Sequence, residues 1–165
     1  MSTRTETLLL LIGKLVYTWS NTESLLIDVM CLLMGVEKNV AIVTYLTLNT
    51  TRARLDLIER LSKLPGVSSQ VQDRVLAISG RMKAASKVRN KYSHSIFSFD
   101  EHGDMDRTEL LRIADFGRNV RYGKVEPLDD EEFQRLSDAI QVLVATNRDI
   151  HDFLNEGAAE PRRSA

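Results

Sequence analysis

The chain has 165 residues, of which 43% are hydrophobic and 27% charged, and its formal net charge is −1. This length suits one domain with a sizeable core, and this composition excludes a disordered chain. The small net charge excludes a global attraction to nucleic acid, so nucleic-acid binding would need a local basic patch. The one cysteine, Cys31, excludes an internal disulfide framework and fits a reducing compartment.

The N-terminal segment contains a short apolar run at residues 8–12. Lys14 interrupts this run and no small-residue cleavage site follows, so we expect no signal peptide. No stretch approaches the roughly 20 apolar residues that a membrane span needs. We therefore expect a cytoplasmic protein that does not contact a membrane.

Apolar residues at helical spacing predict four or five helices. The first helix should run from about Thr5 to Met34, before Gly35. A second should begin near Glu37, and capping and β-branched residues at 47–51 should interrupt it. Asn49 or Thr50 would then cap a third segment that ends at Leu64, before Pro65-Gly66. Ser68 or Ser69 should cap the next helix.

That helix is expected to reach His94, where the hydrophobic period changes. Residues 95–99 alternate as a strand does, 100–106 are typical of a polar turn, and 108–116 could return as a partner strand. We expect residues 95–126 to form a small β-hairpin insertion. The insertion would either wall one side of a site near His94 or cap an open end of the bundle.

Acidic residues at 129–132 begin the last helix, whose apolar seam continues to Leu154. The tail at 157–165 has no apolar period and should be flexible. The expected fold is therefore all-α. Residues 1–156 form a single domain, an up-and-down bundle of four to five helices with the hairpin between the last two long helices.

The seam of the helix that reaches His94 contains a charged residue. Its apolar positions alternate at spacings of four and three, and the next members of the series are Arg89 and Tyr92. A guanidinium on an inward-facing seam needs a partner, water or a ligand. The apolar members of the series are Val71, Val75, Ile78, Met82 and Ala85.

Two other seams have polar breaks that could supply this partner. Glu23 falls in the first helix where an apolar residue is expected, so it is a candidate ion-pair partner of Arg89. It could equally lean to the edge of the seam and be solvated. Asn147 interrupts the last helix, where it could orient Arg89 or Glu23, or set the register of a dimer interface.

The same helix end is rich in cations. Its last fourteen residues contain five basic groups and no acidic one. This density could form a phosphate-binding face. Cations at a helix C-terminus also complement the helix dipole and keep the face soluble, which accounts for Lys83, Lys87 and Lys91 but not for Arg89 on the seam.

Arg89 is followed by Asn90 and, five residues on, by His94. Asn90 and His94 stand at i and i+4, on one edge of the helix. A permanent cation beside the one side chain that ordinarily titrates near neutrality could hold a phosphate.

An Arg followed by a polar residue and, after four intervening residues, by a His at a helix end resembles the signature of the HEPN superfamily. Its members are small helical bundles, usually dimeric, and many are metal-independent ribonucleases of toxin–antitoxin, defence or RNA-processing systems. The resemblance covers the bundle pattern over most of the chain, and its specific part is residues 89–94. It implies RNA as substrate, a homodimer and an antitoxin protein as a candidate partner.

One position departs from the family pattern. In the subset paired with minimal nucleotidyltransferases a Tyr commonly follows the His by two residues, and Ile96 stands there in this chain. Regulation of that kind is therefore not expected.

The resemblance assigns roles to the motif. His94 would act as general base on a ribose 2′-OH or as acid toward the leaving 5′-oxygen, and Arg89 would stabilise the transition state. Asn90 would position the phosphate or hold the His94 ring. Cleavage would occur in a cleft shared by two copies and leave a 2′,3′-cyclic phosphate. The supporting residues are Glu23, Lys87, Lys91, Tyr92 and Asn147.

No metal site or cofactor is expected, because the histidines are scattered and no phosphate-binding glycine loop occurs. Two other classes of function remain open. The chain could be a noncatalytic homodimeric helical interaction or RNA-binding module in which Arg89 and Glu23 form a structural pair. It could also be a nucleotide or small-molecule sensor that binds a phosphate ligand without turnover.

Overall fold

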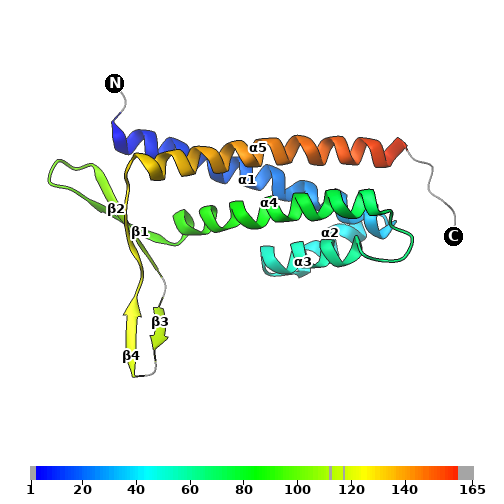
Figure 1. The fold of residues 1–165 in the computed structure, drawn as a ribbon, viewed down its shortest axis with the longest axis horizontal. Helices are drawn as coiled ribbons and strands as arrows, with labels where there is room; N and C mark the ends of the chain where they lie inside the picture. Colours follow the sequence, from blue (N-terminus) through cyan, green and yellow to red (C-terminus); the bar gives the residue numbers. More distant parts are fainter. Residues whose placement is uncertain (1–2, 112, 117, 160–165) are drawn as a thin grey trace.

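The computed structural model describes residues 3–111, 113–116 and 118–159, and this part of the chain is mostly helical, with a small β region before the last helix (Figure 1). Helix α1 packs against α5, α4 packs against α5 and α3, and α2 packs against α1. The helices are α1 (Arg4–Met34), α2 (Lys38–Thr47), α3 (Thr51–Leu61), α4 (Ser69–Ser93) and α5 (Asp130–Ala159). None of the helices in the described residues is long and apolar enough to cross a membrane.

The helix ends follow the local sequence closely. The Thr3 hydroxyl accepts from the Glu6 backbone N–H and the Glu6 carboxylate accepts from Thr3, a capping box that begins α1. Gly35, at φ 63°, ends α1 where the sequence predicts. Thr50 caps α3 by accepting from the Ala53 N–H at 3.1 Å, so the predicted break between α2 and α3 is confirmed.

The expected continuation of α3 to Leu64 is wrong, because the helix ends at Leu61 and turns follow. Leu64 precedes Pro65, and the proline ring disfavours helical backbone at the residue before it. The predicted cap of the following helix is confirmed, since the Ser68 hydroxyl accepts from the Val71 N–H at the start of α4.

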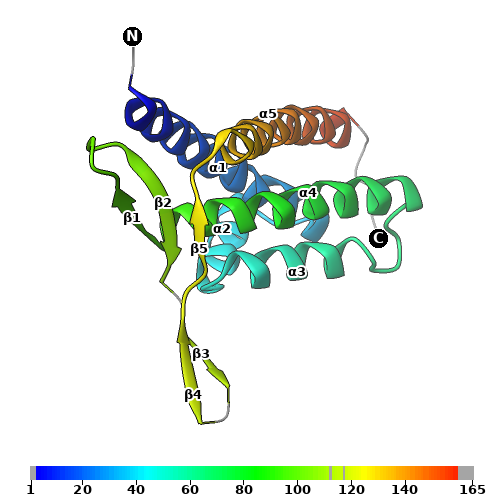
Figure 2. The same cartoon turned by 60° about the vertical axis from the view of Figure 1, so that its left-hand side comes forward.

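The β region is larger than the predicted hairpin. Strands β1 (Ser95–Phe99), β2 (Met105–Leu110) and β5 (Val125–Pro127) form an antiparallel sheet in the order β1-β2-β5. Strands β3 (Ile113–Phe116) and β4 (Asn119–Tyr122) form a separate two-stranded ribbon that projects away from the helices (Figures 1 and 2).

The expectation of one return strand over 108–116 is therefore wrong. The main chain leaves the sheet after Leu110, where the Leu111 N–H donates to the His94 carbonyl at 2.7 Å. On the return path Gly123 passes so close to Leu110 that a Cβ on residue 123 would lie 1.8 Å from the Leu110 carbonyl oxygen. Only glycine permits this crossing, and it separates the ribbon from the sheet.

The predicted start of the flexible tail at residue 157 is wrong. Helix α5 continues to Ala159, and a Cβ on residue 157 would lie 2.6 Å from the Leu32 side chain, so glycine lets α5 pack closely on the end of α1. Arg74 on α4 also holds this part of α5 through Asp149 and Glu156. Residues 160–165 of the predicted tail lie outside the described residues.

The core lies along the seam of α1, α4 and α5, with α3 closing one side. The predicted apolar stripes supply it, and their fully buried members include Leu15, Met30, Met82, Leu136 and Leu143.

Replacing Leu143 with alanine should lower the free energy of unfolding by about 2–5 kcal/mol, because it removes buried methyl groups from the α1–α5 contact. Urea denaturation gives this value. The neighbouring Val144→Ala, which alters a side chain 37% exposed, is the matched control and should change it by less than about 1 kcal/mol. Equal losses in both variants would contradict the placement of the seam.

Candidate functional site

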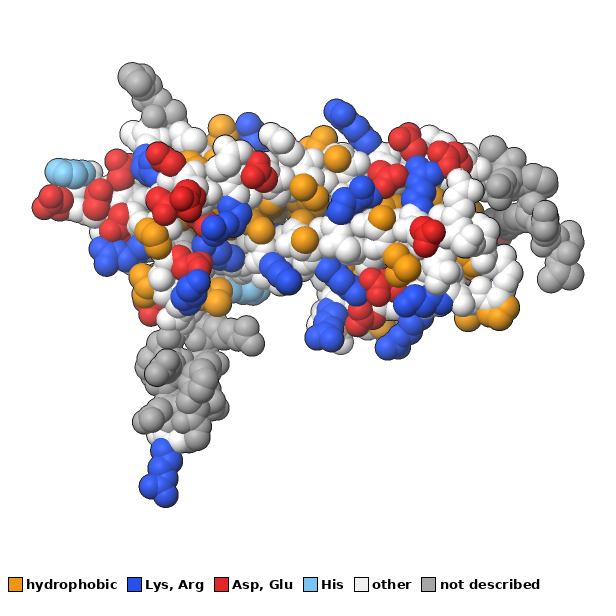
Figure 3. All heavy atoms as spheres, in the orientation of Figure 1, with side chains coloured by type: hydrophobic (Ala, Val, Ile, Leu, Met, Phe, Trp, Pro, Cys, Tyr) orange, Lys and Arg blue, Asp and Glu red, His pale blue; other side chains and the backbone are white. Residues whose placement is uncertain are grey.

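An open cleft of about 640 Å³ lies between the C-terminal half of α4 and the start of α3. From α4 it receives four residues that the sequence predicts for the site, Lys87, Arg89, Asn90 and His94. The other lining residues are Asn49, Thr50, Thr51, Arg52, Asp56, Lys83 and Ser86. Figure 3 shows Lys and Arg side chains, with carboxylates among them, along the edge of the molecule formed by α3 and α4.

Arg89 lies on the seam as predicted and is half-buried. Its guanidinium carbon stands 4.9 Å from the centre of the Trp19 ring, a cation–π contact with an almost fully buried aromatic side chain. Its Nη2 donates to the Thr51 hydroxyl at 3.5 Å. The aromatic face and the hydroxyl thus position the cation at the cleft without neutralising its charge.

The predicted direct pair between Arg89 and Glu23 is wrong. Glu23 instead accepts from the Trp19 indole N–H and from the Thr51 hydroxyl, each at 2.9 Å. Its ion-pair partner is Arg54, at 3.4 Å. Thr51 therefore stands between the two expected partners, since it donates to Glu23 and accepts from Arg89. The expected alternative, a solvated Glu23 at the seam edge, is also wrong.

The charges in the cleft are only partly neutralised. Lys83 pairs with Asp56 and Glu59, and these hydrogen bonds raise the pKa of Lys83. The hydrogen bond from Lys83 likewise lowers the pKa of the Asp56 carboxyl. Among the described residues neither Lys87 nor Arg89 forms an ion pair with a carboxylate. Two cations of the cleft therefore keep their positive charge available.

His94 is the C-terminal cap of α4, and its side chain is exposed at the cleft. Its backbone N–H donates to the Lys91 carbonyl at 3.3 Å, and its carbonyl accepts from Leu111. Asn90 is exposed one helical turn earlier. The backbone of His94 is thus held from both sides, by the helix and by the β region.

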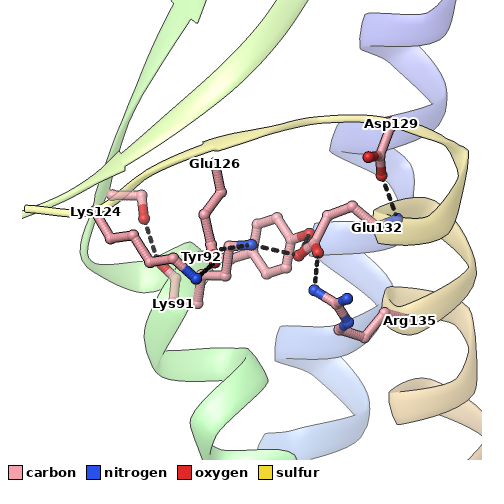
Figure 4. A network of polar contacts seen from close by, with 8 residues as sticks. Lys91, Tyr92, Lys124, Glu126, Asp129, Glu132 and Arg135 are labelled. Atoms are coloured by element: carbon pink, nitrogen blue, oxygen red, sulfur yellow. Dashed lines mark hydrogen bonds and ion pairs between the residues drawn. The ribbon is translucent and has the colours of Figure 1, made fainter.

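Lys91 and Tyr92, two of the predicted support residues, do not line the cleft. Figure 4 shows them in a second polar network, around Glu132 at the start of α5. The buried Glu132 accepts from Lys91 at 2.6 Å and from the Tyr92 hydroxyl at 2.7 Å, and Arg135 also pairs with it. Burial and the Glu132 carboxylate raise the pKa of Tyr92.

This network explains why the cation and the phenol turn away from the cleft. Lys91 also pairs with Glu126 at 2.6 Å, so it joins α4, β5 and α5. A carboxylate as buried as Glu132 requires such donors. The network holds the end of α4 that carries Asn90 and His94.

Asn147 is also outside the cleft, and its predicted contact with Arg89 or Glu23 is wrong. Its amide donates to the Thr22 hydroxyl at 3.3 Å, and Thr22 is fully buried. The residue thus links α5 to α1 within one chain.

The prediction missed the contribution of α3 and of the segment before it. Thr51 and Arg54 complete the support of Arg89 and Glu23, and Asn49 and Thr50 line the cleft. The sequence signal was available, because the break at 47–51 exposes the start of a helix whose dipole favours an anion. The contact between Thr51 and Arg89 was not predicted, because the two residues lie far apart in the sequence.

The described residues contain no group of three or more His, Cys, Asp or Glu side chains that could hold a metal ion. Comparison with known proteins finds no match for the chain among family models, curated proteins or solved structures.

A double-mutant cycle tests the position of Glu23. Glu23→Gln combined with Arg54→Gln should give a coupling energy of about 1 kcal/mol or more, because the two residues form a partly buried ion pair. The cycle of Glu23→Gln with Arg89→Gln should give a smaller value, because Thr51 separates these residues. Urea denaturation measures both. A larger coupling energy between Glu23 and Arg89 than between Glu23 and Arg54 would contradict this assignment and indicate a direct Glu23–Arg89 pair.

The Glu126 pairs predict a dependence of stability on pH. Hydrogen bonds from Lys124 and Lys91 lower the pKa of Glu126 from 4.5 to about 2 in the folded state. Because the folded pKa lies below the unfolded value, this stabilisation is present above about pH 4.5 and is lost as the pH falls toward about 2. The stability difference between wild type and Glu126→Gln should shrink from pH 7 to pH 3. A difference that is the same at both pH values would contradict the assignment.

Proposed function

We propose that the chain is a metal-independent RNA endonuclease of the HEPN-like toxin, defence or RNA-processing type. The observation that carries this proposal is the convergence of Arg89, Asn90 and His94 on one open cleft, together with the unneutralised Lys87. Lys87 and Arg89, the two cleft cations without a carboxylate partner among the described residues, favour a phosphodiester as ligand. The first turn of α3 lines the other side of the cleft and adds the positive end of a helix dipole.

The proposed reaction is an internal transfer at phosphorus. The ribose 2′-oxygen forms a bond to phosphorus, the bond from phosphorus to the 5′-oxygen breaks, and a 2′,3′-cyclic phosphate and a 5′-hydroxyl result. His94 takes the 2′-hydroxyl proton or supplies a proton to the 5′-oxygen. Arg89 stabilises the charge that grows on the non-bridging oxygens, and Asn90 holds the phosphate.

Two copies of the chain would complete the site, one histidine acting as base and the other as acid. An unpartnered apolar surface supports a homodimer. Helix α2 buries only Ala41 and Tyr45, and it exposes apolar side chains at i, i+3 and i+6, the pattern of a helix face that packs on another protein. The exposed residues are Val40, Val43 and Leu46. The chain continues from this face directly into Asn49 and Thr50 of the cleft.

The proposal places the protein in the cytoplasm, with RNA as substrate and an antitoxin protein as a further partner. The free Cys31 agrees with a reducing compartment.

The second candidate is a noncatalytic homodimeric interaction or RNA-binding module. The packing of Arg89 on Trp19 and its hydrogen bond to Thr51 favour it, because these contacts give the arginine a structural use without any substrate.

Cleavage of an end-labelled RNA pool in EDTA tests the proposal. Wild type should cut and leave cyclic-phosphate ends, and His94→Ala should cut about 100-fold more slowly or worse, because it removes the general acid–base group. Arg89→Ala should lose a similar factor. Arg89→Lys keeps the positive charge but loses the planar, forked guanidinium. It therefore tests whether cleavage needs the hydrogen-bond geometry of arginine in addition to its charge.

The matched control is His151→Ala, which removes an exposed histidine of α5 that does not line the cleft. It should cut as wild type does, and equal losses in both histidine variants would reveal a contaminating nuclease. RNA binding without cleavage in wild type would support the binding module. If wild type neither cuts nor binds, and His94→Ala stays dimeric and equally stable, the interaction module is favoured.

A further inference from the structure

The ribbon of β3 and β4, here called the arm together with Arg118 of its turn, pairs with no other strand among the described residues. Its strands pair with each other alone and form a sheet apart from β1-β2-β5. Both cartoon views show it extending away from the helices (Figures 1 and 2). An isolated two-stranded ribbon is only marginally stable in water, so contact with another molecule would stabilise it.

The root of the arm lies at the cleft. Leu111, the residue after β2, donates its N–H to the carbonyl of His94, and the Leu110 N–H donates to the Lys124 carbonyl at 3.2 Å. The glycine crossing at Gly123 fixes the return path. His94 lines the cleft, so a polymer that occupies the cleft and continues past His94 meets the root of the arm.

The arm concentrates positive charge in a chain whose net charge is −1. Residues 113–122 contain two cations, Arg118 and Arg121, against the single carboxylate Asp115, and Lys124 follows just after the arm. Lys124 is paired with Glu126, and Arg118 is exposed at the turn. Arg118 is therefore an exposed cation of the arm, and the sequence of β4 adds a second, Arg121.

From this placement we propose that the arm binds the phosphate backbone of the RNA strand that flanks the cleft. The inference rests on the proposed function and adds to it a substrate longer than the scissile dinucleotide. A four-residue strand spans about 13 Å. That length matches roughly four phosphates of a stacked nucleic-acid strand, which follow one another at about 3.4 Å along its axis. The excess of positive charge in the arm favours RNA over an apolar protein surface.

The experiment compares a long and a minimal substrate. The variant Arg118→Gln/Arg121→Gln should lower kcat/KM about tenfold on a 12-nucleotide RNA, and the slope of log affinity against log salt should fall by about 1.4, the value for two lost single-strand contacts. Turnover of a dinucleoside monophosphate should not change, because it is too short to reach the arm.

The matched control, Lys14→Gln/Arg148→Gln, removes the same charge from exposed positions of α1 and α5 outside the cleft. It should leave both substrates and the salt slope unchanged. Equal loss on both substrates in the arm variant would show a structural role and overturn the inference. No loss on either substrate, or an equal loss in the control, would also overturn the inference. A change in the molecular mass of the arm variant by light scattering would overturn it too, because it would show that the arm contacts a protein.

Failure of the inference and failure of the proposed function give different results. If wild type cleaves and the arm variant cleaves equally well, only the inference fails. If wild type binds RNA without cutting it, the proposed nuclease fails, and fluorescence anisotropy of the same RNA then tests the arm through affinity and salt slope. Wild type that neither binds nor cuts RNA overturns both.

Discussion

A guanidinium on an otherwise apolar helix seam constrains the architecture around it. Arg89 can occupy that position because the Trp19 ring lies under it and Thr51 accepts from it. Those two residues are themselves held by Glu23, which accepts from both and pairs with Arg54. The result is a polar layer through α1, α3 and α4 in which the carboxylate is satisfied by other donors and the Arg89 charge remains available at the cleft. Arg89 is therefore held by an aromatic ring and a hydroxyl and not by a carboxylate.

A second polar centre performs a different task. Glu132 is buried at the start of α5, and the donors from Lys91, Tyr92 and Arg135 compensate its desolvation. Two residues of the cation-rich helix end are thereby committed to fixing α4 against α5 and β5. The basic run of α4 is thus divided between a structural network and a cleft, so counting its charges overstates the cations available to a ligand.

The cleft and the arm belong to one arrangement in the proposed function. His94 ends α4, and its carbonyl anchors the backbone just before the arm begins. A helix end, a histidine and a basic ribbon therefore follow one another in space as they do in sequence. The apolar face of α2 leads into the opposite side of the same cleft. This arrangement would let a second copy of the chain and a polynucleotide approach the same site from different directions.

The sequence by itself determined the helices, most of their caps, and the grouping of Lys87, Arg89, Asn90 and His94, because periodicity, capping and i, i+4 spacing act within a few residues. Only the tertiary structure decided which partner each polar seam residue meets. Glu23 pairs with Arg54 rather than Arg89, Asn147 meets Thr22, and Lys91 turns to Glu132. The division of the insertion into a sheet and an arm was likewise decided by the close crossing of Leu110 and Gly123. Such contacts depend on how distant segments approach one another, which no local pattern encodes.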